Sequence, residues 1–215
     1  MKNQKGQTLI EVIIAVFIMI VGVVSLVSVA ITYNVMSRQS SHEIVAMNLA
    51  RENIEAIRNQ RDSNMLAIEA GSPIITSWDY NLFSTITTDY TVVWTLNTTT
   101  GAFASTYIPN DFTFNQTKIF QKNNIYFQNA IGTAPIGATT SVFRRLAYIY
   151  PICRDKIFPY AETVCTSLVD CPVTGTCDLA NEDKVGMDVR VQVQWYENTA
   201  VKNYYLQETM YDWKY

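Results

Sequence analysis

The sequence predicts an α+β protein in which one long N-terminal helix packs on an antiparallel β-sheet. Residues 12–31 contain no charged side chain, and as a helix they would span about 30 Å, the thickness of a hydrocarbon core. Near the C-terminus, residues 188–195 alternate valine or tryptophan with polar residues, which is the period of a half-buried strand. Between these segments, four cysteines in residues 153–177 indicate a disulfide-stapled insertion.

The helix is expected to continue beyond its apolar first half. No proline follows the apolar run until Pro73, and no glycine until Gly71. Apolar residues then recur at three- and four-residue spacing, which predicts one face that packs on a sheet: Ile44, Met47, Ala50, Ile54 and Ile57. We therefore predict a short leader at 1–6, a helix over 7–65 with its transmembrane part at about 9–31, and a β-rich domain over 66–215.

Composition argues against several classes of function. The net charge is −3, and only 16% of the 215 residues are charged. No positive electrostatic potential that attracts polyanions is therefore expected. Arg144 and Arg145 are too few to argue for DNA uptake, and we predict no nucleic-acid partner. The sequence contains no serine elbow, phosphate loop or pair of catalytic carboxylates. We therefore expect a non-enzymatic protein without a cofactor.

The N-terminus has the charge pattern of a membrane anchor. Lys2 and Lys5 precede the apolar run without any acidic residue, so the positive-inside rule places the N-terminus in the cytoplasm and the domain outside. A secretory signal peptide is a poor match, because the run is too long, Glu11 lies near its start and no A-x-A site follows. A plain single-pass anchor explains the length, and Glu11 would then snorkel to the interface.

One short motif accounts for Glu11 as well as for the length of the apolar run. Residues 5–12, Lys-Gly-Gln-Thr-Leu-Ile-Glu-Val, resemble the cleavage motif of type IV prepilins and of type II secretion pseudopilins. The resemblance implies that a prepilin peptidase cuts after Gly6 and methylates the new amino terminus at Gln7. Most members of the family have phenylalanine or methionine where this chain has Gln7, which leaves the efficiency of methylation and the type of subunit open.

The electrostatics of the cleaved chain agree with that implication. Cleavage after Gly6 would create an α-amine whose ordinary pKa is about 7.7–8.0, so it is mostly cationic at neutral pH. Glu11 would be the fifth residue of the mature chain, about one helical turn from that amine. In an apolar filament core both charges are unfavourable unless they pair. Glu11 is therefore predicted to act in assembly.

The outer domain is predicted to be a meander that packs on the second half of the helix. Its expected strands lie at 90–96, 143–150, 188–195 and 204–213. In the third strand the inward face is predicted to carry Val189, Val191, Val193 and Trp195. The pair of C-terminal strands also resembles the closing hairpin of minor pilins and of minor type II secretion pseudopilins.

The four cysteines favour disulfides over a metal site. Cys153, Cys165, Cys171 and Cys177 are separated by eleven, five and five residues, whereas a zinc site usually has a pair separated by two to four. With a membrane anchor and an exported domain, this pattern predicts two disulfides. Three connectivities are possible, and the sequence does not choose among them.

Two further candidate sites are weaker. Acidic and amide side chains gather just before the third strand at Asp178, Asn181 and Asp183. Oxygen ligands of this kind suit calcium, and major pseudopilins hold calcium in a comparable place, but the spacing is not that of an EF-hand. A solvated acidic turn is the favoured interpretation. His42, the only histidine, is interpreted as a surface residue of the helix.

These observations lead to one interpretation and two alternatives. We interpret the chain as a structural subunit, a minor pilin, of a type IV pilus-like filament on the cell surface. The implied partners are the prepilin peptidase, other pilin subunits, the inner-membrane assembly platform and membrane lipid. A pseudopilin of a secretion or DNA-uptake machine is the first alternative. A membrane-anchored binding or adhesin module that never polymerises is the second.

Overall fold

The computed structural model describes most of the chain as two compact units. The described residues are 7–82, 90–96, 103–109, 112–129, 131–165, 177–178, 180–197 and 200–212. One unit ends at Ile44 and the other runs from Val45 to the C-terminus.

One helix, α1, runs from Gln7 to Glu69, as the absence of internal proline allows. It ends in a Schellman motif, in which Gly71 N–H donates to the Ile68 carbonyl (3.0 Å) and Ser72 N–H to the Ala67 carbonyl (2.9 Å). Gly71 has φ +75°, a conformation that glycine adopts without strain. Pro73 follows and cannot continue a helix.

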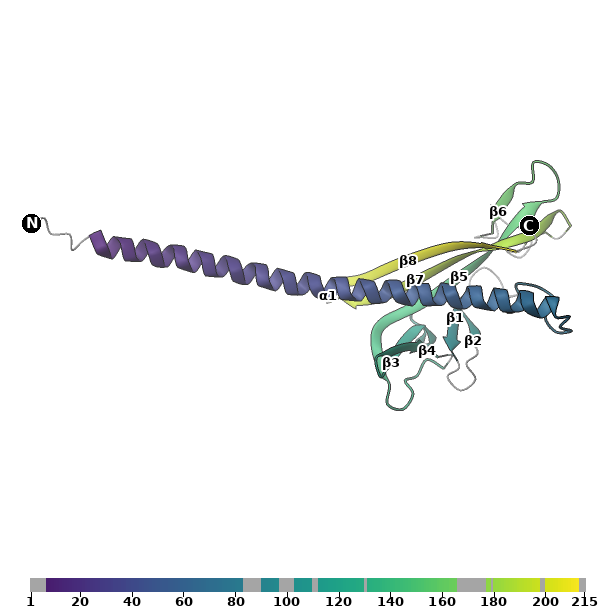
Figure 1. Cartoon of the computed structure of the whole chain (residues 1–215), viewed down its shortest axis with the longest axis horizontal. Helices are drawn as coiled ribbons and strands as arrows, with labels where there is room; N and C mark the ends of the chain where they lie inside the picture. The colour runs from purple at the N-terminus through teal and green to yellow at the C-terminus, as the bar shows by residue number, and fades with distance from the viewer. Residues whose placement is uncertain are drawn as a thin grey trace, which may run out of the picture. The chain divides into compact units, whose positions relative to one another are not determined.

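Among its described residues, the second unit contains an antiparallel sheet of eight strands (Figure 1). Their bounds, with the short 3-10 helix η1, are β1 Tyr90–Leu96, β2 Phe103–Pro109, η1 Asn115–Thr117, β3 Lys118–Lys122, β4 Ile125–Gln128, β5 Thr139–Asp155, β6 Glu162–Val164, β7 Glu182–Glu197 and β8 Ala200–Tyr211. The α+β fold class is therefore confirmed. The side chains of β1 and β2 lie outside the described part of the chain.

The strand order is not the simple meander expected from the sequence. β5 pairs with β7 along one edge, from Phe143↔Trp195 to Asp155↔Glu182. Its other edge pairs in succession with β3, β1 and β6. The reason is length, since β5 has 17 residues against a usual five or six. One strand of that length accommodates three short partners on the same edge.

The core lies between the sheet and the second half of α1. Val189, Val191, Val193 and Trp195 of β7 are all buried, which confirms the predicted inward face. On the helix, the predicted stripe is correct for Ala50, Ile54 and Ile57 but wrong for Ile44, which is exposed. The packed face begins instead at Ala46 and includes Leu49. These side chains meet the sheet at the three- and four-residue spacing of one helix face.

A buried arginine connects α1 to the sheet. Arg145 of β5 is 3% exposed, and its Nη1 donates to the Leu49 carbonyl at 2.9 Å. Its Nε donates to Gln128 Oε1 of β4 at 3.2 Å, and Glu52 lies 3.5 Å from the guanidinium. Burial lowers the pKa of the Arg145 guanidinium, and Glu52 offsets part of that effect. A desolvated charge of this kind is tolerated because its donors are paired.

Candidate maturation and assembly site

The helix of the N-terminal unit is apolar and uncovered. All described side chains from Leu9 to Ser41 are exposed, including an almost continuous series of valines, isoleucines and leucines up to Ile31. Among the described residues, α1 is the one helix that is long and apolar enough to cross a membrane. A helix that is apolar all round requires either lipid or other apolar helices around it.

Polar side chains within this unit bond to their own helix. Ser25 Oγ donates to the Val21 carbonyl at 2.8 Å, and Thr32 Oγ1 donates to the Ser28 carbonyl at 3.0 Å. Asn34 Nδ2 donates to the Ala30 carbonyl at 2.9 Å. Hydrogen bonds within the segment satisfy polar groups that have no water to bind in a bilayer. These residues are therefore compatible with an apolar environment.

Glu11 is the one charged residue between Gln7 and Ser37. It is exposed, and within the described part of the chain it forms no ion pair. Residues 1–6, including Gly6, and the side chain of Gln7 lie outside the description, whereas α1 begins at Gln7. Cleavage after Gly6 would place the new α-amine on Gln7, the first residue of the helix. Glu11 is four residues later, and positions i and i+4 lie on the same helix face. The amine and Glu11 of one chain are thus within reach of each other.

The comparison with protein families identifies the N-terminal segment. Residues 1–31 match the family model for the prokaryotic N-terminal methylation motif, the signature of type IV pilins and pseudopilins. The chain thus combines that signature with a long apolar helix and an antiparallel sheet. No curated protein and no solved structure matches the chain.

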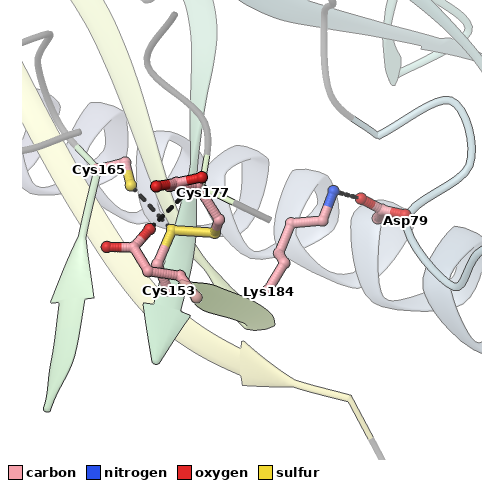
Figure 2. Close-up of a disulfide and its surroundings, with 7 residues drawn as sticks. Asp79, Cys153, Cys165, Cys177 and Lys184 are labelled. Atoms are coloured by element: carbon pink, nitrogen blue, oxygen red, sulfur yellow. Dashed lines mark hydrogen bonds and ion pairs between the residues drawn. A yellow bond between two sulfur atoms is a disulfide. The ribbon is translucent and has the colours of Figure 1, made fainter. Parts of the chain in front are cut away.

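The cysteines gather at the base of the β5–β6 hairpin. Cys153 and Cys177 form a disulfide with a Cα–Cα distance of 5.4 Å, and Cys165 Sγ lies 3.0 Å from Cys153 Sγ (Figure 2). All three are buried. The bond attaches β5 to the segment that precedes β7. Among the described residues, these three are also the one group of potential metal ligands close together, within 4.8 Å. Cys171 lies outside the description.

The observed bond reduces the possible connectivities to one. Because Cys153 pairs with Cys177, a second disulfide must join Cys165 to Cys171. We expect two linkages in peptide maps of the non-reduced protein. Cleavage after Leu168 separates Cys165 from Cys171, and mass-spectrometric fragmentation between Cys171 and Cys177 assigns the partner of each. The Cys153–Cys177 bond closes a loop of 24 residues, which by chain entropy stabilises the fold by about 3–4 kcal/mol. Two free thiols, a different pairing or stoichiometric zinc in the purified protein would contradict this prediction.

The calcium hypothesis gains no support from the geometry. Asp178 accepts hydrogen bonds from Asn181 Nδ2 at 2.7 Å and from the Ala180 amide at 3.1 Å, as in a self-contained acidic turn. Asp183 instead pairs with Lys156 at 3.5 Å. The partners of Asp178 and Asp183 are therefore local protein groups. His42, the other isolated candidate, is half-buried on α1.

Several organising polar residues were missed by the sequence reasoning. Asn64 Nδ2 donates to the carbonyls of Trp78 (3.0 Å) and Tyr80 (2.8 Å), fixing the segment after α1. Lys184 points toward Asp79 and pairs with it, which joins that segment to β7 (Figure 2). The one sequence signal for Asn64 was its amide side chain, because it lies within an amphipathic part of the helix. The ion pair had no signal, because its partners are far apart in the sequence.

Proposed function

We propose that this chain is a structural subunit of a type IV pilus-like filament, matured by cleavage after Gly6 and assembled through its N-terminal helix. The observation that carries the proposal is Glu11, an exposed carboxylate near the start of an uncovered apolar helix, within the matched signature. Before assembly the helix is held in the inner membrane, with its first residues in the cytoplasm. After assembly, the helices of other pilin subunits replace the lipid.

The charges at the start of the helix support this route. A cationic amine at a helix N-terminus is disfavoured by the helix dipole, and an unpaired carboxylate is disfavoured in apolar surroundings. Pairing the amine of Gln7 with Glu11, of the same or a neighbouring chain, relieves both costs. The pairing also sets the axial register of the subunit. A plain anchor has no comparable use for Glu11.

Within this class we favour a minor pilin, a subunit less abundant than the main one. The support is the resemblance of the C-terminal hairpin, now β7 and β8, to the closing hairpin of such subunits. A pseudopilin of a type II secretion or DNA-uptake machine shares the N-terminal signature and remains the first alternative. The alternative from another class is a membrane-anchored adhesin, which would keep the helix in lipid and never enter a filament.

A Gly6→Leu chain is expected to remain an uncut precursor in the membrane. The peptidase must fit the backbone closely at the scissile bond, and a branched side chain prevents that approach. The measurement is the apparent mass of the chain on a denaturing gel, in cells that contain the prepilin peptidase. Gly22→Leu is the matched control, because a side chain at Gly22 would contact no other part of the chain. Normal processing of Gly6→Leu would overturn the proposed maturation.

A further inference from the structure

The sheet formed by β5, β7 and β8 carries tyrosine and amide side chains on one face. The alternate valines of β7 lie in the core with α1, so Gln192 and Gln194 between them belong to the opposite face. Their partners in register on the neighbouring strand β8 are Tyr205 and Asn203. We name this surface the tyrosine–amide face, and its residues are Tyr148, Gln192, Gln194, Asn203, Tyr205 and Gln207.

A chain of hydrogen bonds fixes these side chains across three strands. Tyr148 Oη of β5 donates to Gln192 Oε1 of β7 at 3.2 Å. Gln192 Nε2 in turn donates to two acceptors on β8, Tyr205 Oη at 2.9 Å and Asn203 Oδ1 at 3.0 Å. Side chains that are already held in position lose little conformational freedom when a ligand binds. The tyrosine–amide face is therefore preorganised.

Tyr205 is fixed at its hydroxyl but open to solvent at its ring. Its hydroxyl accepts the hydrogen bond from Gln192, and yet 66% of the residue is exposed. Tyrosine combines a large apolar ring with a polar tip, which is why it is enriched at binding surfaces. The Tyr205 ring thus offers a flat apolar surface in a defined place, against which another flat group can stack.

Amide groups with unused hydrogen-bonding capacity surround this ring. Gln194 Nε2 donates to Asn203 Oδ1 at 3.3 Å, and Gln207 Nε2 donates to Asp188 Oδ1 at 2.8 Å. Within the described part of the chain, no partner binds Asn203 Nδ2 or the Oε1 atoms of Gln194 and Gln207. An amide nitrogen carries two donors, and an amide oxygen has two acceptor sites. The face therefore presents donors and acceptors beside an apolar ring.

Two charges border the face and pair with each other. Arg190 Nε donates to Asp188 Oδ2 at 2.7 Å, and the guanidinium lies over the Tyr150 ring, 5.1 Å from its centroid. Asp188 is itself buried. The pairing leaves this border without net charge, and the whole chain is acidic. A polyanionic ligand is therefore disfavoured.

We propose that the tyrosine–amide face binds a neutral polysaccharide in an extended conformation, with one sugar ring stacked on Tyr205. A sugar ring has apolar C–H faces and a border of hydroxyls, each of which both donates and accepts hydrogen bonds. This chemistry is complementary to an exposed aromatic ring surrounded by amides. A protein ligand is a poorer match, because protein interfaces centre on anchors in desolvated pockets. The inference does not depend on the proposed filament, since the face belongs to the second unit alone.

The test measures binding of the full-length chain to cellulose, a neutral and extended polysaccharide, and to soluble cellohexaose. The chain is kept in a phosphocholine detergent, because maltoside detergents carry sugar headgroups that would compete. We expect retention on cellulose and release by cellohexaose. Tyr205→Ala is expected to raise the Kd for cellohexaose, measured by calorimetry, about tenfold or more. Tyr205→Phe keeps the ring and is expected to raise the Kd by about threefold or less.

Tyr160→Ala is the matched control, because Tyr160 is an exposed tyrosine in the turn between β5 and β6, outside the face. We expect its Kd to equal that of the unaltered chain. Absence of retention on cellulose, or an equal Kd for Tyr205→Ala and the unaltered chain, would overturn the inference. Stronger retention on polygalacturonate than on cellulose would do the same, since it would make the ligand a polyanion.

A second readout separates ligand binding from subunit contact. We expect Tyr205→Ala to enter filaments as often as the unaltered chain. Reduced incorporation together with unchanged binding of cellohexaose would make this face a contact between subunits and overturn the inference. None of these outcomes bears on cleavage after Gly6 or on the entry of the unaltered chain into filaments, so the proposed function is tested separately.

Discussion

A Glu11→Ala chain is expected to be cleaved normally and to fold normally, yet to enter filaments hundreds of times less often than the unaltered chain. Removal of the carboxylate leaves the amine of Gln7 without a partner in an apolar bundle. An uncompensated buried charge costs about 3–5 kcal/mol, and each 1.4 kcal/mol changes an equilibrium tenfold. The measurement is the ratio of filament-associated to membrane-bound subunit.

The control for this variant is Glu43→Ala. Glu43 is exposed on the same helix but follows the apolar run. Its removal therefore leaves the amine of Gln7 paired with Glu11. We expect its ratio to equal that of the unaltered chain. An unchanged ratio for Glu11→Ala would mean that Glu11 is a snorkelling interface residue, and the plain anchor would then explain the N-terminus better.

Arg145→Ala is expected to destabilise the second unit by about 3 kcal/mol. The change removes a large side chain from a close-packed interior, which costs about 2–5 kcal/mol. It also removes the donor to Gln128 Oε1, and Gln128 is itself buried. For a domain of this size, each kcal/mol lowers Tm by about 2–4 °C. The measurement is thermal unfolding of the full chain in detergent, monitored by near-UV circular dichroism.

Two variants show whether this effect comes from the buried site. Arg51→Ala removes an exposed guanidinium from α1, and we expect a change within about 0.5 kcal/mol. Arg145→Met keeps most of the buried volume, so its loss of stability is expected to be smaller than that of Arg145→Ala. Equal stability of Arg145→Ala and Arg51→Ala would contradict the role assigned to the buried contacts.

The features that followed from periodicity were predicted well. Uninterrupted helical sequence predicted α1, and strict alternation predicted the inward valines of β7, because burial of one face imposes a period on the chain. The error at Ile44 arose because a stripe of apolar residues does not tell where along a helix its contacts begin.

Features that depend on distant residues were not predictable. The three partners of β5 on one edge depend on which strands meet in space, and local pattern does not encode that choice. Arg145 was considered only as a candidate contact to DNA, although three groups from α1 and β4 surround it. The Cys153–Cys177 pairing likewise required the fold, since spacing alone allowed three connectivities. By contrast, Gly6, Gln7 and Glu11 form a local motif, which the sequence reveals without the fold.

The most direct measurement of prepilin maturation is the mass of the N-terminal peptide of the chain recovered from sheared filaments. We expect a peptide that begins at Gln7 and carries one methyl group on its α-amine. A chain that retains Met1, or one cut after Ile31, would contradict prepilin maturation and leave the membrane-anchored or secreted alternatives in its place.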